Sequence, residues 1–216
     1  RLRAEPAVAV LTASRDCTAK VWNAASGACE LSLEGHGSPV NFASFAPDCR
    51  SIVTGSDDGT AKVWSVDVGE CQLTLKGHRG AVYCALFTAD SARILTSSED
   101  GTAKLWGVKH GCVERTFRHG CPVLSAMFNS DATVVRTVGQ DGTLKLWNVK
   151  TGKCDRTMLG HTTSSYVAAF SRDGELFVTP SGERDAKIYS TESGACVREL
   201  LGHEHIVLSA SFAQTA

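Results

Sequence analysis

Short segments in which hydrophobic and polar residues alternate recur along the whole chain. Three of them, VNFASF (40–45), VYCALF (82–87) and VLSAMF (123–128), share one pattern, and SIVTGS (51–56) and RILTSS (93–98) share a second. All are rich in β-branched or aromatic residues and are bounded by Gly, Asp or Ser. The pattern predicts β-strands joined by tight turns.

An eight-residue motif occurs four times. It reads RDCTAKVW at 15–22, DDGTAKVW at 57–64, EDGTAKLW at 99–106 and QDGTLKLW at 140–147. The aromatic residues that close the repeats are Trp22, Trp64, Trp106, Trp147 and Tyr189, with spacings of 42, 42, 41 and 42 residues. A second marker in the same register is the histidine at His36, His78, His119, His161 and His203. Such a fixed period indicates stacked copies of one supersecondary unit.

About forty residues per repeat, divided into four strands, leave no room for a helix. We therefore predict an all-β fold, a β-propeller of four-stranded antiparallel blades, with about five blades in one domain spanning residues 1–216. The expected blades are 7–34, 36–76, 78–117, 119–159 and 161–201, followed by a C-terminal strand at 206–213.

The repeats resemble those of the WD-repeat (WD40-type) β-propeller family. A Gly-His pair opens a unit in GHGSPV, GHRGAV, GHTTSS and GHEHIV, and a Trp closes it. The residue after the Trp departs from the family pattern, because it is Asn23, Ser65, Gly107 or Asn148 and never Asp. Since most relatives have seven blades, the resemblance favours a segment of a larger, seven-bladed propeller, although the phasing of the terminal strands also permits a ring of five.

The resemblance also implies a hydrogen-bonded tetrad of His, Ser, Asp and Trp inside each blade. In blade 2 it comprises His36, Ser56, Asp58 and Trp64. In blade 3 it comprises His78, Ser98, Asp100 and Trp106. Blade 4 offers His119, Asp141 and Trp147, with Gly139 where the hydroxyl is expected. A neutral histidine allows the donors and acceptors of such a set to pair in order.

A cluster of Ser, His and Asp also describes a hydrolytic triad. A catalytic serine needs one exposed copy beside an oxyanion hole, whereas this set recurs at equivalent positions. The glycines of DDG, EDG and QDG belong to turns, and no helix follows them to bind a phosphate. We therefore expect no enzyme activity, no cofactor and no small-molecule substrate.

Nine cysteines invite a disulfide or metal interpretation. Five of them recur at one register, namely Cys29, Cys71, Cys112, Cys154 and Cys196. Equivalent positions on neighbouring blades should lie beyond the roughly 7 Å that a disulfide can bridge. No CxxC pair exists, and RHGCP at 118–122 supplies only one His and one Cys, so we expect no metal site. Unpaired thiols favour a reducing compartment, cytoplasmic or nuclear.

The charge pattern argues against nucleic-acid and membrane partners. The formal net charge is −1, and the recurrent lysines two residues before each closing aromatic residue are dispersed around the blades rather than lined up along a groove. The longest apolar run, AVAVL at 7–11, is far too short for a membrane span.

Two functions then remain. The first is a protein–protein interaction scaffold that assembles a multiprotein complex, as the resemblance implies for most relatives; the second is a peptide-motif reader or substrate receptor in a ubiquitin ligase or chromatin complex. Candidate partner-binding residues are those whose identity varies between repeats at the rim. They are Arg15, Asp57, Glu99 and Gln140 before the tetrad acid, and Asn41, Tyr83 and Tyr166 at the start of the inner strands. We expect Tyr83 beside Glu99 to be the first contact, because Tyr is a preferred interface anchor.

Overall fold

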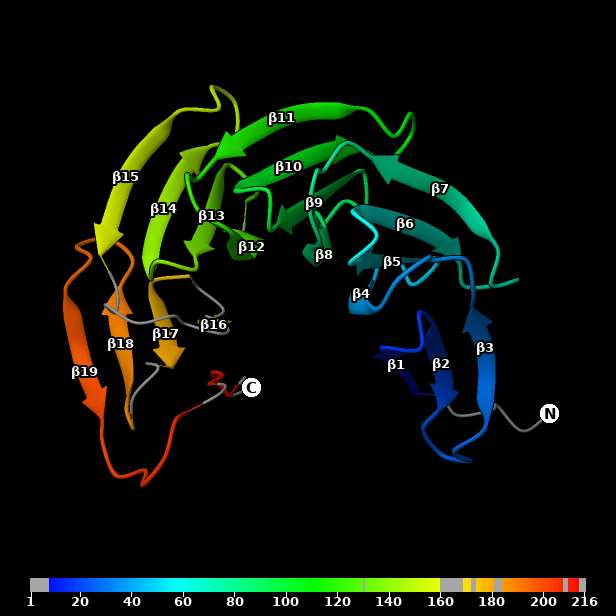
Figure 1. Cartoon of the computed structure of the whole chain (residues 1–216), viewed down its shortest axis with the longest axis horizontal. Coiled ribbons are helices and arrows are strands. Elements are labelled where there is room, and N and C mark those ends of the chain that lie inside the picture. The colour runs from blue at the N-terminus through cyan, green and yellow to red at the C-terminus, as the bar shows by residue number, and fades with distance from the viewer. Residues whose placement is uncertain are drawn as a thin grey trace. The chain divides into compact units, whose positions relative to one another are not determined.

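The computed structural model describes residues 8–129, 131–159, 169–171, 174–180, 184–207 and 210–213. Within these ranges every regular element is a β-strand (Figure 1). No helix in this part of the chain is long and apolar enough to cross a membrane.

The strands form five sheets in chain order, which we call blades 1 to 5. Blade 1 has three strands: β1 (Ala9–Ala13), β2 (Ala19–Asn23) and β3 (Cys29–Leu33). Blade 2 consists of β4 (Val40–Phe45), β5 (Ser51–Ser56), β6 (Thr60–Ser65) and β7 (Cys71–Lys76). Blade 3 consists of β8 (Val82–Phe87), β9 (Arg93–Ser98), β10 (Thr102–Gly107) and β11 (Val113–Arg118).

Blade 4 consists of β12 (Val123–Phe128), β13 (Val134–Gly139), β14 (Thr143–Asn148) and β15 (Cys154–Leu159). Blade 5 consists of β16 (Ala169–Phe170), β17 (Leu176–Pro180), β18 (Ala186–Ser190) and β19 (Cys196–Leu200). The predicted all-β fold of antiparallel blades is confirmed. Of the segment 206–213, which was expected to form a strand, the structure describes residues 206, 207 and 210–213, and it assigns none of these to a strand.

The chain divides into two compact units. The first comprises Arg1–Thr96 with Leu105–Glu114, and the second comprises Ser97–Lys104 with Arg115–Ala216.

In the first unit, hydrophobic side chains of consecutive blades pack together. Trp64 of β6 lies in a cluster with Val21 and Leu33 of blade 1, and it is only 1% exposed. A second cluster joins Val53 and Leu75 of blade 2 to side chains that include those of Val82, Ile94 and Trp106. The stacking of blades therefore buries the apolar faces that one four-stranded sheet leaves exposed.

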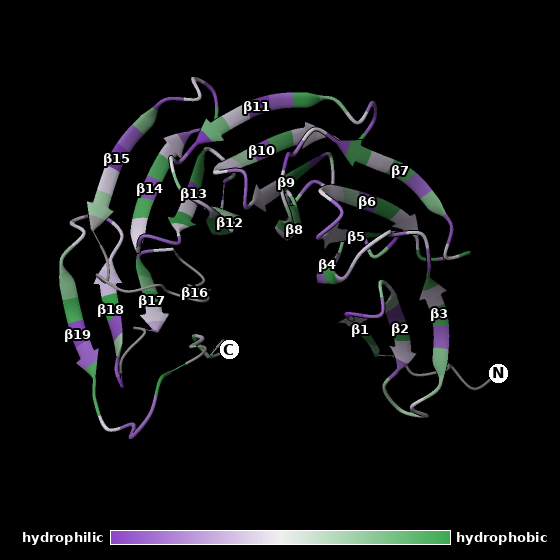
Figure 2. Ribbon diagram, in the orientation of Figure 1, coloured by the Kyte–Doolittle hydropathy of each residue, from purple (hydrophilic) through white to green (hydrophobic). Residues whose placement is uncertain are grey.

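In the second unit, blades 4 and 5 pack in the same way. Val138, Leu144 and Met158 of blade 4 contact Phe177 and Tyr189 of blade 5. The ring of Tyr189 stacks on that of Phe177 at a centroid distance of 5.0 Å, so the tyrosine fills the position that Trp holds elsewhere. The outer strands are more polar, and Figure 2 shows hydrophilic stretches on β7, β11 and β15.

The recurrent cysteines lie at the first residue of the outer strands, or, for Cys112, directly before it. Cys71 is paired across the ladder with Trp64, next to a register shift, and Cys154 is paired in the same way with Trp147. The Cys71 sulfur donates to the main-chain oxygen of Leu73. All nine cysteines carry free thiols.

The turn between the second and third strand positions of blades 1 to 4 contains a residue in the left-handed conformation. Gly59 adopts φ 78°, Gly101 φ 79° and Gly142 φ 76° in these turns. Blade 1 has Cys17 there, with φ 71°. A side chain in this conformation costs roughly 1 kcal/mol, which explains why blades 2, 3 and 4 have glycine there.

Candidate functional site

A chain of hydrogen bonds crosses blade 2 from its tryptophan to its aspartate. Trp64 Nε1 donates to Thr54 Oγ1 at 2.8 Å, and Thr54 Oγ1 lies 2.7 Å from His36 Nε2. The other ring nitrogen, Nδ1, lies 2.8 Å from Asp58 Oδ2. The Asp58 carboxylate also accepts the main-chain N–H of Gly37 at 3.0 Å and the hydroxyl of Thr60 at 2.6 Å.

The protonation states follow from these contacts. Because Asp58 can only accept while it is ionised, His36 Nδ1–H donates to it, and Nε2 accepts from the Thr54 hydroxyl. Burial lowers the pKa of His36, which keeps the imidazole neutral near pH 7. Burial alone would raise the pKa of Asp58, but hydrogen bonds from Thr60, His36 and Gly37 outweigh it and lower that pKa to about 2.

The hydroxyl of this network comes from Thr54, so the assignment of Ser56 to the tetrad is wrong. Ser56 ends β5 beside the turn, where its Oγ accepts the main-chain N–H of Asp58 at 3.1 Å and donates to Ser38 O at 2.9 Å. Blade 3 needs the same correction. Trp106 Nε1 donates to Thr96 Oγ1 at 2.8 Å and His78 Nε2 lies 2.7 Å from it, whereas Ser98 Oγ accepts the N–H of Asp100.

The sequence contained a signal for the correct residue. A threonine stands ten residues before every closing aromatic residue, at Thr12, Thr54, Thr96, Thr137 and Thr179. The serine two positions later is replaced by Gly139 in blade 4. The position that holds threonine in every repeat is the one whose hydroxyl accepts the indole N–H. This is also true in blade 1, where Trp22 Nε1 donates to Thr12 Oγ1 at 2.8 Å.

Blade 4 differs from blade 2 around its histidine. Trp147 Nε1 donates to Thr137 Oγ1 at 2.8 Å, and His119 Nδ1 lies 2.8 Å from the same oxygen. His119 Nε2 is 2.7 Å from Thr143 Oγ1, and Asp141 Oδ1 is 4.0 Å from the ring, so Thr143 stands between the expected partners. Burial, with the positive charge of Lys145, lowers the pKa of His119 to about 4.

The hydroxyls at the centres of these networks are inaccessible. Thr54 and Thr96 are each 0% exposed, and each already accepts an indole N–H. A substrate cannot approach such an oxygen without unfolding the blade. The networks therefore tie the second and third strands of a blade to the segment that precedes its first strand.

The Asp58 carboxylate predicts a loss of stability in acid. Its pKa is about 2 in the folded chain against an ordinary 3.8, so the unfolded chain takes up the proton at higher pH. The stabilisation is complete above about pH 4 and is lost as the pH falls through 2, at about 1.4 kcal/mol per pKa unit or roughly 2 kcal/mol in total. Protonation of His36 below its ordinary pKa of 6.5 acts in the same direction. Urea unfolding at a series of pH values should show this slope in the wild type and a flatter one in Asp58→Asn.

The matched control is Asp16→Asn, which removes a fully exposed carboxylate from the equivalent turn of blade 1. That variant should keep most of the acid slope. A slope in Asp58→Asn equal to that of the wild type would contradict the role assigned to Asp58.

Two of the predicted rim residues meet in blade 2. Asn41 Nδ2 donates to Asp57 Oδ1 at 2.6 Å and to the main-chain oxygen of Val82 at 3.2 Å. The register of β4 against β5 shifts between Val40 and Phe42, which makes Asn41 the extra residue of a β-bulge. A bulge turns a side chain out of the regular alternation and is common beside functional sites. Leu124 is the corresponding bulge residue of blade 4.

The other rim residues are placed individually. Arg15, Glu99 and Gln140 are exposed in the turns after β1, β9 and β13, and Tyr83 is half-buried in β8. Tyr83 belongs to the first compact unit and Glu99 to the second, so their expected proximity stays a prediction. Tyr166 lies outside the described residues.

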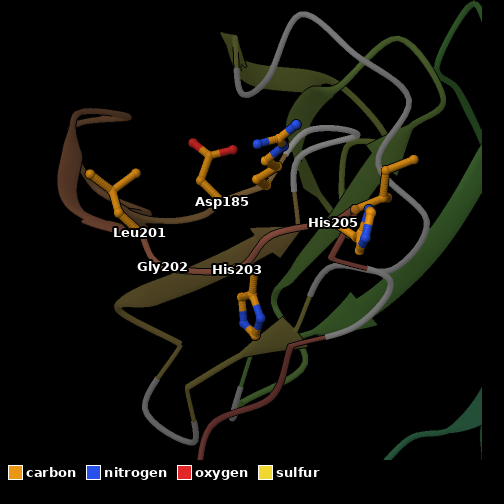
Figure 3. Close-up of a pocket in the computed structure, with 7 residues that line it drawn as sticks. Asp185, Leu201, Gly202, His203 and His205 are labelled. Carbon is orange, nitrogen blue, oxygen red and sulfur yellow. The ribbon is translucent and has the colours of Figure 1, made fainter.

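A hollow of about 630 Å³ lies in the second unit (Figure 3). Its lining residues are Arg184, Asp185, Leu201, Gly202, His203, His205 and Ile206. In Figure 3 the side chains of Asp185 and His203 point away from each other, and Asp185 lies 3.8 Å from Lys187 Nζ. This geometry does not form an acid–base pair. Among the described residues, one group of ligand-type side chains could hold a metal ion, namely His119, Cys121 and Asp141.

Comparison with known proteins identifies the repeats. The family described as WD domain, G-beta repeat matches three segments, residues 27–65, 69–107 and 111–148, which together make up just over half of the chain. No curated protein matches the chain.

Proposed function

Because the chain belongs to the WD domain, G-beta repeat family, we propose that it is a scaffold that binds a protein partner through the rim of blade 2 and the adjoining strand β8. WD40 repeats generally mediate protein–protein interaction and complex assembly, and are generally non-enzymatic. The contact surface that we assign is formed by Asn41, Asp57 and Tyr83, which we call the rim patch.

The pair formed by Asn41 and Asp57 carries this proposal. Its side chains project from a β-bulge and from a turn, while the strands behind them repeat almost letter for letter. The second bond of Asn41, to Val82 O, links the pair to the residue before Tyr83. A rigid frame that presents variable side chains is suited to recognition, since little conformational entropy is lost on binding.

The chemistry of the rim patch defines the partner segment that it suits. Asp57 is exposed and contributes a carboxylate, Asn41 is exposed and contributes an amide, and Tyr83 contributes a half-buried ring with a polar tip. A basic or amide-rich segment with one apolar side chain complements this set, because Tyr buries a large area and keeps one hydrogen-bonding group.

Truncation of Tyr83 should weaken partner capture without unfolding the chain. We expect Tyr83→Ala to cost about 1 kcal/mol or more in binding, which is a fivefold or larger loss of affinity. The melting temperature should stay nearly unchanged. Quantitative capture from cell lysate, followed by mass spectrometry, measures the loss for each protein retained by the wild type.

Val68→Ala serves as the control, since Val68 is 62% exposed in the β6–β7 turn at the other end of β6. Equal losses in both variants, or a fall in stability of Tyr83→Ala as large as that of Trp64→Ala, would overturn the rim assignment. If one short synthetic peptide replaces the whole captured partner, the alternative of a peptide-motif reader is favoured.

The free thiols favour a reducing cellular compartment for this scaffold. Five cysteines at the outer strands are exposed and unpaired. Thiols persist in this state in reducing compartments, so we assign the protein to the cytoplasm or nucleus as part of the proposal.

A further inference from the structure

Blade 4 has an arginine at a position where the other four repeats have a hydrophobic residue. Directly before the threonine of each repeat, Arg136 stands in place of Leu11, Val53, Leu95 and Val178. In blade 2, Val53 is 0% exposed and belongs to the hydrophobic cluster that joins blades 2 and 3. Arg136 is 8% exposed and is paired across the ladder with Leu146, as Val53 is with Val63. A permanently charged guanidinium therefore occupies a position that elsewhere is apolar.

Gly174 of blade 5 provides the space for this guanidinium. Gly174 is left-handed, with φ 70°, and the corresponding left-handed residues of blades 2 to 4 all carry side chains, namely Cys49, Ser91 and Ala132. A Cβ atom built on Gly174 would lie 2.7 Å from Arg136 Cζ, which is closer than two such atoms can approach. The absence of a side chain at Gly174 thus lets the guanidinium of blade 4 lie against the backbone of blade 5.

Thr191 is a third departure from the repeat at the same junction. Its main-chain N–H donates to Glu175 O at 2.8 Å, and the matching N–H groups of blades 2 to 4 belong to Val66, Val108 and Val149. Thr191 is 6% exposed, and its Oγ1 is buried without a hydrogen-bond partner among the described residues. Because buried hydroxyls are nearly always hydrogen-bonded, Thr191 has a bond to offer to a bound group.

Arg136 and Thr191 line one hollow of about 400 Å³, which is separate from the hollow of Figure 3. This volume is within the range of about 300–1,000 Å³ that is usual for ligand pockets. Its lining includes three half-buried apolar side chains, Val134, Leu146 and Leu176, and two exposed carboxylates, Glu175 and Glu192. All of these residues belong to the second compact unit, whereas the rim patch belongs to the first. The hollow is therefore a different surface from that of the proposed function.

The charges of the hollow define the group that it suits. A guanidinium binds a carboxylate through charge-assisted hydrogen bonds, and the hydroxyl of Thr191 adds a further donor. A phosphate would bring about two negative charges beside Glu175 and Glu192, whereas a carboxylate brings only one. The two exposed glutamates in turn attract a positive charge next to the bound carboxylate.

We propose that this hollow binds an Asp or Glu side chain of a protein segment that has a Lys or Arg beside it. The carboxylate bonds Arg136 and Thr191, and its aliphatic carbons lie against the apolar walls. The neighbouring basic side chain pairs with Glu175 or Glu192. A segment of chain fits this arrangement because the exposed glutamates can contact the residues that flank the acidic anchor.

Capture of capped peptides by the immobilised chain tests the proposal, with mass spectrometry as the readout. One pool has a glutamate beside a lysine among randomised uncharged residues, and the matched pool has glutamine in place of the glutamate. We expect the wild type to retain the glutamate pool at least roughly tenfold better, because the glutamine pool lacks the charge-assisted bond. Arg136→Leu, which restores the residue of blade 3, should abolish this preference, and Thr191→Val should reduce it roughly threefold or more.

The matched control is Arg50→Leu, which removes an exposed arginine from the blade 2 position that corresponds to Glu175 and changes the net charge equally. That variant should keep the preference of the wild type. The melting temperature reports folding, and if Arg136→Leu is poorly folded, Thr191→Val decides, since valine occupies its position in blades 2 to 4. Equal retention of both pools by the wild type, or an unchanged preference in the folded variants, would refute the site. Displacement of the peptides by free glutamate at equal concentration would refute the assignment to a protein segment.

Discussion

Trp64→Ala should lower the free energy of unfolding by about 3 to 5 kcal/mol, the range for a fully buried aromatic side chain. Trp64 is 1% exposed and packs between blades 1 and 2 against Val21, Leu33 and Ile52. Its indole also donates the hydrogen bond that fixes Thr54. The alanine would leave a cavity between two sheets and an unfilled acceptor, and neither blade can close over it without moving a strand.

Equilibrium unfolding in urea measures this loss, and Trp22→Ala is the control. Trp22 has the same place in blade 1 and the same bond to a threonine, but it is only half-buried. Its replacement should cost clearly less than that of Trp64. Equal costs would show that burial between blades is not what makes Trp64 important.

Thr54→Val should destabilise the chain by roughly 2 to 4 kcal/mol, although the two side chains have nearly the same shape. The hydroxyl of Thr54 is 0% exposed and serves both Trp64 Nε1 and His36 Nε2. Valine leaves both of these buried groups unpaired. Each unpaired buried group typically costs about 1 to 3 kcal/mol.

Ser56→Ala separates the two hydroxyls of β5. Ser56 bonds only the turn, through Asp58 N and Ser38 O, so we expect a loss of about 1 kcal/mol or less. Unfolding curves of the two variants, recorded side by side, give the comparison. A larger effect for Ser56→Ala would mean that the serine, and not the threonine, completes the network.

Partner capture can also be measured for Trp64→Ala and Thr54→Val. Both variants act on the interior of blade 2 and leave the rim patch of Asn41, Asp57 and Tyr83 intact. Capture by folded Thr54→Val should therefore equal that of the wild type at a temperature well below its melting point. If capture is lost only as the variant unfolds, the hydrogen-bond network of blade 2 acts on stability and is separate from the contact surface.

The amino-acid sequence by itself determined the repeat, the strands and the fold class. The reason is that a fixed period with alternating hydrophobic residues is a local signal, readable without knowing what any strand touches. The Gly of each DDG-type turn was readable in the same way, since the left-handed conformation at Gly59 depends on the backbone of that turn alone.

Hydrogen-bond partners were decided by tertiary structure. Thr54 and Ser56 both carry a hydroxyl group. Because they are two residues apart on one strand, they also face the same side of the sheet. In the folded blade the His36 ring and the Trp64 indole both lie beside the hydroxyl of Thr54, whereas the hydroxyl of Ser56 bonds to the turn. The bond between Asn41 and Asp57 likewise depends on a bulge, which alternation does not reveal.

The convergence of His119, Cys121 and Asp141 in blade 4 shows the same division most clearly. Cys121 follows His119 by two residues, a spacing visible in the sequence, but the carboxylate that lies beside them comes from a distant part of the repeat. Asp141 and Gly139 lie about twenty residues further on, and only the pairing of β12 with β13 brings them beside the cysteine. Sequence determined which side chains were present, and the pairing of strands decided which of them meet, because a ladder joins residues that are distant along the chain.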